Sequence, residues 1–207
     1  MHPFAAYILL ALFALTLSGG EIPHGVVALL PPVLRVSAAP LHLRGAVYRT
    51  GYNAMMSEGY RLRSSGDVRR CLTNEGCHAW YDFSAGQYAR TAAMLQVPWL
   101  YQIDIDQYAP ETVEYRNARN RVLSQKHLLR LGFSFYRIDG QNGRRELLAR
   151  VADAKYDSTD AARFPAVPGG TIHRTREEFN RAAVAIALRQ LCTAAAQADR
   201  QFFSSSR

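Results

Sequence analysis

Lysine is almost absent from this sequence of 207 residues: of its 25 Lys and Arg residues, 2 are lysine (Lys126 and Lys155) and the other 23 are arginine. The net charge is +8, yet the arginines are scattered among acidic residues. Nucleic-acid-binding proteins usually carry clustered basic stripes that include lysine, so no nucleic-acid partner is expected. A GC-rich genome explains the lysine shortage, because alanine and glycine are also abundant; avoidance of lysine modification inside a host cell is the alternative.

Motifs of well-known catalytic and metal sites are also absent. The sequence contains no GxSxG, P-loop, GxGxxG or HExxH pattern, and no CxxC or HxxxH spacing, so no metal is expected. Asp104 and Asp106 share one face of a predicted strand and form either an acidic pair or the polar side of a half-exposed strand. Four histidines stand apart from one another and are interpreted as surface or structural residues: His42, His78, His127 and His173.

Acidic and basic residues are missing from the first 20 positions, and residues 4–17 are almost wholly apolar. About 14 apolar residues are too few to cross a bilayer comfortably but suit a signal-peptide core. Residues 1–20 are therefore predicted to be a signal peptide, with a membrane anchor as the alternative. Residues 21–40 contain four prolines and are interpreted as a linker, a propeptide or a peripheral strand. The predicted location is secreted and extracellular, with no stable membrane anchor after signal removal.

Cysteine is scarce, and the three cysteines, Cys71, Cys77 and Cys192, leave one over in any pairing. Cys71 and Cys77 flank a short polar loop that a disulfide between them would close. Alternatively, one of the two bonds Cys192 and ties the C-terminal helix to the body of the protein. The sequence leaves both pairings open.

Apolar alternation and capping residues predict the elements of the first half. Ser84 followed three residues later by Gln87 is a capping-box pattern and marks a helix start. Residues 60–77 are polar and rich in turn residues, which indicates a loop. The predicted elements are a strand at 43–50, a helix at 53–59, a strand at 78–83, a helix at 84–97 and a strand at 99–106.

In the second half, the clearest signals are a strand, a turn and a long final helix. Thr175 and Glu178 form a second capping-box pattern at the start of that helix. The mixture of strands and helices without regular alternation predicts an α+β fold. The predicted elements are a polar connection at 107–119, a helix at 120–132, a strand at 133–138, a hairpin turn at 139–143, an ambiguous segment at 144–156 and a helix from 175.

The order of these segments resembles that of the ADP-ribosyltransferase toxins, the group of the heat-labile enterotoxin A subunit and the pertussis toxin catalytic subunit. A Tyr-Arg strand of that family is similar to "VYRTGYNAMMSEGYRLR", which contains Tyr48 and Arg49. A strand that leads into a helix is similar to "AWYDFSAGQYARTAA", and a tyrosine-rich strand to "WLYQIDI". The segment of the catalytic glutamate is similar to "SQKHLLRLGFSFYRIDG". The resemblance covers residues 43–143, about half of the chain.

This resemblance implies two small packed β-sheets flanked by helices, plus a C-terminal helix, in a single domain of residues 41–207. It implies NAD as substrate and transfer of ADP-ribose to a host protein. Arg49 would bind the dianionic NAD by bidentate hydrogen bonds, Ser84 would support the nicotinamide side, and Gln125 stands at the position of the catalytic glutamate. A partner subunit and uptake into host cells are expected from the same resemblance.

The sequence departs from the family pattern at the most important position. Gln125 lacks the negative charge of a glutamate, and losing that charge would lower the rate on the order of a thousandfold. The residues "YDF" replace the Ser-Thr-Ser element, and Gly51 stands where the family has an aspartate. Either Glu111 or Glu114 supplies the carboxylate, or the protein is a catalytically inactive secreted effector that uses the same scaffold to bind proteins.

Overall fold

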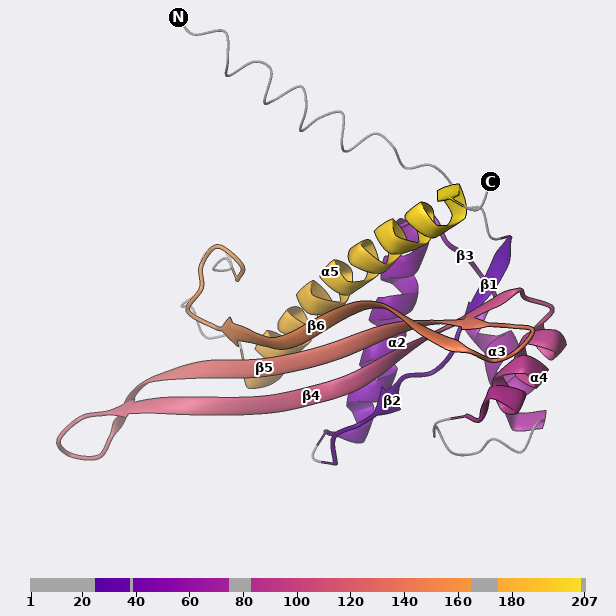
Figure 1. Ribbon diagram of the computed structural model, residues 1–207. Coiled ribbons are helices and arrows are strands. Elements are labelled where there is room, and N and C mark those ends of the chain that lie inside the picture. The colour runs from indigo at the N-terminus through magenta and orange to yellow at the C-terminus, as the bar shows by residue number, and fades with distance from the viewer. Residues whose placement is uncertain (1–24, 38, 75–82, 165–174, 206–207) are drawn as a thin grey trace, which may run out of the picture.

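A single sheet of six strands forms the centre of the computed structural model, which describes residues 25–37, 39–74, 83–164 and 175–205 (Figure 1). The strand order is β3-β1-β4-β5-β6, and β2 also pairs with β4. β1 and β2 pair with β4 in parallel, whereas β4, β5 and β6 form an antiparallel meander. The strands are β1 (Val26–Leu29), β2 (Val33–Leu34), β3 (Arg61–Leu62), β4 (Trp99–Arg116), β5 (Val122–Asp139) and β6 (Arg145–Asp157).

Two helices cover each face of this sheet. α2 (Leu41–Ser57) and α5 (Arg176–Ser205) lie side by side on one face, and α3 (Ser65–Asn74) and α4 (Ala85–Leu95) cover one end of the other face (Figure 1). The predicted α+β class is therefore confirmed. The finer prediction of two small packed sheets is wrong, because the described strands form one sheet through continuous pairing.

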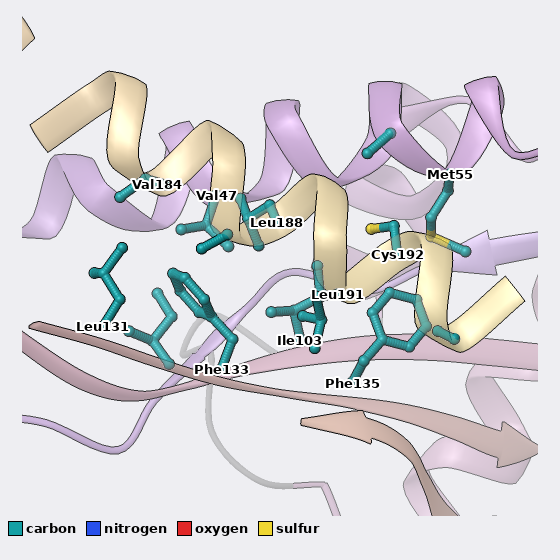
Figure 2. Close-up of a cluster of buried hydrophobic side chains, with 14 of the residues drawn as sticks. Val47, Met55, Ile103, Leu131, Phe133, Phe135, Val184, Leu188, Leu191 and Cys192 are labelled. Carbon is teal, nitrogen blue, oxygen red and sulfur yellow. The ribbon is translucent and has the colours of Figure 1, made fainter. Parts of the chain in front are cut away.

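The larger core lies between the sheet and the helices α2 and α5 (Figure 2). Alternate residues of β4 and β5, such as Ile103, Phe133 and Phe135, point to this side and are fully buried. Leu188 and Leu191 of α5 meet them at helical spacing. A smaller core lies on the other face, where Leu100 and Ile138 contact apolar residues of α3 and α4. This part of β4 is therefore buried on both faces of the sheet.

Residues 43–50, together with the rest of the segment "GAVYRTGY" (45–52), lie within helix α2, so the strand predicted at 43–50 is wrong. The residues that decide this point are four apart: Leu43, Val47, Gly51 and Met55 are all buried against the sheet or α5. Gly51 allows the close approach, because a Cβ there would lie 2.7 Å from Cδ1 of Ile103. Eight residues were too short a window to show this period against the strand preference of valine, tyrosine and threonine.

The polar connection at 107–119 and the helix at 120–132 are also wrong. β4 continues to Arg116 and β5 begins at Val122, and the two strands pair along almost their entire length. The predicted loop at 60–77 contains β3 and α3. For residues 21–40, which the sequence left open between a linker, a propeptide and a peripheral strand, the structure places strands at Val26–Leu29 and Val33–Leu34.

Both capping boxes are confirmed. The Ser84 hydroxyl accepts a hydrogen bond from the Gln87 backbone N–H, and the Gln87 side chain accepts one from the Ser84 N–H. Thr175 and Glu178 make the same reciprocal pair at the start of α5. The strand at 99–106, the strand at 133–138 and the final helix are confirmed as well. The predicted strand at 78–83 lies largely outside the described residues.

Cys71 and Cys192 are buried on opposite sides of the sheet, so the pairing of Cys71 with Cys192, one of those that the sequence left open, does not form. Cys192 of α5 belongs to the larger core, and its Sγ lies 4.0 Å from the Gly51 carbonyl oxygen. Cys71 of α3 belongs to the smaller core. Cys77 lies outside the described residues. Cys192 ties α5 to α2 by packing and not by a covalent bond.

Alkaline solution is expected to destabilise this core. Burial raises the pKa of the Cys192 thiol from 9.0 to about 12 and that of Tyr48 from 10.0 to about 12, and it raises the pKa of Tyr60 and Tyr101 as well. Because the unfolded chain ionises first, stability is fully present below pH 9.0 and decreases as the pH rises toward 12. Urea unfolding between pH 7 and pH 11 tests this, and an unchanged free energy of unfolding across the range would contradict it.

Candidate interaction site on the β4–β5 arm

The three residues predicted to bind NAD or to mark its catalytic position lie on separate elements. Arg49 is exposed on α2, which covers one face of the sheet. Ser84 is exposed at the N-terminus of α4, which covers the other face, and its side chain caps that helix. Gln125 is exposed on β5, where its side-chain amide donates to Glu114. The structure therefore does not bring Arg49, Ser84 and Gln125 together in one cleft.

Asp104 and Asp106 share one face of β4, as predicted, but each already has cationic or hydroxyl partners. The buried Asp104 accepts hydrogen bonds from Arg35 at 2.9 Å and from Arg145 at 3.0 Å. Asp106 accepts one from the Ser134 hydroxyl at 2.5 Å. These contacts neutralise Asp104 inside the sheet and favour a structural role over an acidic site.

Within the described part of the chain, the outer part of the β4–β5 hairpin lies away from both hydrophobic cores. We call residues 110–127 the arm. Figure 1 shows it extending well beyond the helices. From Thr112 and His127 outward, β4 and β5 pair only with each other among the described strands, because β6 accompanies β5 no further than Leu128. Most of its side chains are exposed.

The tip of the arm is a well-formed turn that carries three arginines. The Asn117 side-chain oxygen accepts hydrogen bonds from the backbone N–H groups of Arg119 and Arg121, at 3.0 and 2.9 Å. Arg116 donates to the Asn120 carbonyl at 3.0 Å and pairs with Glu114. Asn120 adopts the left-handed conformation, φ 59°, which asparagine tolerates better than most residues. These bonds give the tip a defined shape.

Large apolar side chains accompany these arginines. The exposed fraction is 51% for Tyr115, 42% for Val122 and 69% for Leu123. Leu123 is the extra residue of a β-bulge, since Tyr115 pairs with Ser124 and Arg116 pairs with Val122. The bulge is the feature that sets the strand register next to the turn.

A groove of about 620 Å³ lies where the arm passes the first turn of α5. His127 forms part of its wall: the ring Nδ1 lies 3.2 Å from the Thr112 hydroxyl, and the ring lies beside Phe179 with centroids 6.3 Å apart. Of the described residues that line it, Arg176 is the one with a formal charge. The lining residues are Thr112, Val122, Leu123, Ser124, Gln125, His127, Thr175 and Arg176.

From the sequence, Gln125 was singled out as the position of a catalytic glutamate. No binding role was assigned to the other residues that line the groove. The available signal was the alternation in "ETVEYR" and "VLSQKH" on either side of "NARN", which is typical of two strands joined by a turn. His127 was interpreted as a structural histidine, and its contacts with Thr112 and Phe179 agree with this interpretation.

Comparison with known proteins gives only remote likenesses. No family model and no curated protein matches the chain. Among solved structures, the lipoprotein GNA1162 from Neisseria meningitidis is 11% identical, with a TM-score of 0.45 over 64% of this chain and 80% of that one. The PelC dodecamer from Paraburkholderia phytofirmans is 9% identical, with a TM-score of 0.40 over 88% and 91%. The LpoB C-terminal domain from Salmonella enterica is 12% identical, with a TM-score of 0.38 over 70% and 89%.

The resemblance to the ADP-ribosyltransferase toxins is therefore wrong, and so is the toxin function that it implied. Two of the similar solved structures are described as lipoproteins, GNA1162 and a minor lipoprotein from Acinetobacter baumannii, and none of those named above is described as a toxin of that group. The geometry gives the physical reason: the Tyr-Arg "strand" is a helix, and the segment assigned to the catalytic glutamate runs along β5 from the arm into the centre of the sheet.

Proposed function

We propose that this protein is a non-catalytic binding protein that acts outside the cytoplasm and docks its arm onto an acidic protein partner. The observation that carries the proposal is the arm tip, where three arginines stand beside three exposed apolar side chains. Both kinds of contact are presented by a ribbon that contributes little to the core.

The exposed apolar side chains of the arm support a docking role. Seven large hydrophobic residues are exposed in the described part of the chain, and Tyr115, Val122 and Leu123 gather at the arm tip. A two-stranded ribbon gains little stability by itself, so an extension of this kind is poorly explained by folding alone. Contiguous exposed apolar residues next to polar ones commonly mark interaction surfaces.

The sign of the charge supports an acidic partner. Residues 116–121 contain Arg116, Arg119 and Arg121 and no acidic residue, and Arg176 lines the adjacent groove. The planar guanidinium group matches a carboxylate with two parallel hydrogen bonds. Charges at the rim of an interface increase the association rate and select the partner, while the apolar side chains supply contact area.

Action outside the cytoplasm rests on the sequence, because residues 1–20 lie outside the described residues. Their apolar stretch at 4–17 supports export by a signal peptide. Among the helices that the structure describes, none combines the length and the apolar character needed to cross a membrane.

Replacing Arg116, Arg119 and Arg121 together by glutamine is expected to weaken binding of an acidic probe about tenfold. Three rim ion pairs at about 0.5 kcal/mol each give a loss of that size. The probe is a fluorescein-labelled peptide of three Glu-Val repeats, and its Kd is measured by fluorescence anisotropy at about 0.05 M salt. At about 0.5 M salt the difference is expected to shrink, because the charges are screened.

The matched control replaces three exposed arginines far from the arm, Arg61, Arg69 and Arg189, by glutamine, which changes the net charge equally. An equal loss of affinity in both triple variants would attribute binding to overall charge and refute the proposal. Binding to phosphatidylglycerol vesicles through the arm, with no binding of the peptide, would also refute it by indicating a lipid surface.

A further inference from the structure

β5 pairs with β4 along its whole length but has β6 as a second partner strand only from Leu128 to Ile138. Followed from the sheet toward the arm tip, β5 pairs with β6 as far as Leu128. At the following residue, His127, the backbone carbonyl accepts a hydrogen bond from the Ser158 N–H at 2.9 Å. The His127 N–H in turn donates to the Ser158 hydroxyl at 2.9 Å. Both backbone groups of His127 therefore point to the side of β6. Across the arm, His127 and Thr112 form a pair whose backbone groups point away from each other.

The same geometry exposes the backbone of Gln125. Glu114 pairs with Gln125 in unbroken register with Thr112 and His127, so this pair is of the same type. The Gln125 N–H and C=O point to the side of β6, and β6 has already ended at Asp157. Beside Gln125, no strand of the described residues occupies the position that β6 would have taken. Among the described residues, this edge of β5 is open.

The opposite edge of the arm is less suited to pairing. Pro110, Thr112 and Glu114 are the β4 residues whose backbone faces outward, since they alternate in register. Pro110 has no N–H to donate, and proline at such a position blunts an edge strand. The open edge of β5 carries no proline. The two edges therefore differ in their capacity to accept another strand.

The groove lies beside the open edge and suits the side chains of an added strand. Successive side chains of a strand alternate between its two faces, so every second residue of the added strand would face the groove. There Leu123 offers an apolar surface and Arg176 a positive charge. An extended peptide with acidic and apolar residues matches this lining.

We infer that the acidic partner binds as an extended strand that adds to the sheet at the open edge of β5, next to Gln125. This inference rests on the proposed function and specifies its mode of contact. Strand addition of this kind takes its affinity from backbone hydrogen bonds and its selectivity from alternate side chains.

A pair of proline variants tests the inference with the same Glu-Val peptide. Gln125→Pro removes the outward N–H of the open β5 edge, and Glu114→Pro removes the outward N–H at the other end of the same cross-strand pair. Both variants lose the Gln125–Glu114 side-chain contact, and Glu114→Pro also loses the Glu114–Arg116 ion pair. Gln125→Ala and Glu114→Ala remove the same side-chain contacts without blocking either edge, so each proline variant is compared with the alanine variant at its own position. Gln125→Pro is expected to weaken peptide binding about fivefold or more, and Glu114→Pro less than about twofold.

Methylated peptides supply a second measurement on the unaltered protein. Two versions of the peptide carry N-methyl groups on alternate residues, one set on the odd and one on the even positions. One version is expected to lose binding and the other to retain it, because an added strand pairs through one edge only. Retention by both versions, or equal losses in the two proline variants, would overturn strand addition. If the three-arginine variant still loses affinity in that case, docking through the arm stands without it.

Discussion

Replacing Asp199 by alanine is expected to lower the free energy of unfolding by about 3–5 kcal/mol, the usual cost of leaving one member of a buried ion pair alone. Asp199 is fully buried on α5 and accepts a hydrogen bond from Arg137 of β5 at 3.0 Å. The hydroxyls of Tyr60 and Tyr101 donate to its other oxygen, at 2.6 and 2.8 Å. The alanine variant leaves all three donors without this acceptor.

The contacts of Arg137 show which part of the fold Asp199 holds in place, the end of α5. The guanidinium carbon lies 3.7 Å from the ring centroid of Phe202 and 5.0 Å from that of Trp99. The remaining carboxylate partner of the guanidinium among the described contacts is Glu146, whose side chain is 56% exposed. Without Asp199, the last turns of α5 lose the polar contact that fixes them against the sheet.

Thermal unfolding and urea unfolding measure this effect, with a decrease in Tm of about 10 °C expected for a chain of this size. Asp199→Asn is expected to cost less than Asp199→Ala, because it retains one acceptor oxygen. Burial raises the pKa of Asp199, against the lowering effect of Tyr60, Tyr101 and Arg137. Glu177→Ala on the same helix removes an exposed pair with Arg181 and should cost under about 0.5 kcal/mol. A similarly small cost for Asp199→Ala would show that the network adds no stability.

Local signals predicted those parts of the fold that depend on neighbours in sequence. The capping boxes at Ser84 and Thr175 were correct because the bonding partners are three residues apart. The strand 99–106 was correct because its apolar face alternates over its own length. Only the end of helix α2 was predicted as a helix, within residues 53–59, and its first part was predicted as a strand. The buried positions from Leu43 to Met55 are recognised as one helical face from their contacts with α5 and the sheet.

The arm is a part of the fold that was predicted wrongly from the sequence. The alternation on either side of its turn is a weak strand signal, and the extended form of its exposed residues follows from pairing that begins inside the core at Leu131 and Tyr108. Gln125 illustrates the consequence for function. As a single residue it was compared with a catalytic glutamate, whereas its place at an open edge depends on where β6 ends.

The hairpin turn at 139–143 was predicted from the sequence. Its last residue, Gly143, also packs against the start of helix α4, and replacing it is the second change with a large expected effect on stability. Gly143→Ala is expected to lower the free energy of unfolding by about 2–5 kcal/mol, as left-handed strain and overpacking add together. Gly143 is buried at φ 69°, and its N–H donates to the Asp139 carbonyl at 2.8 Å. A Cβ there would lie 1.9 Å from the backbone oxygen of Ala85, the first residue of α4.

The matched control for this prediction is Gly25, which has nearly the same φ, 64°, but no atom of the described residues within 4 Å of an added Cβ. Gly25→Ala retains the backbone strain without the collision and should cost about 1 kcal/mol. Urea unfolding of both variants isolates the steric part as the difference between them. Equal losses would mean that the β5–β6 turn and α4 move apart without cost. A larger loss at Gly143 would show that the turn holds the first turn of α4 against the sheet, an effect that hairpin sequence rules do not contain.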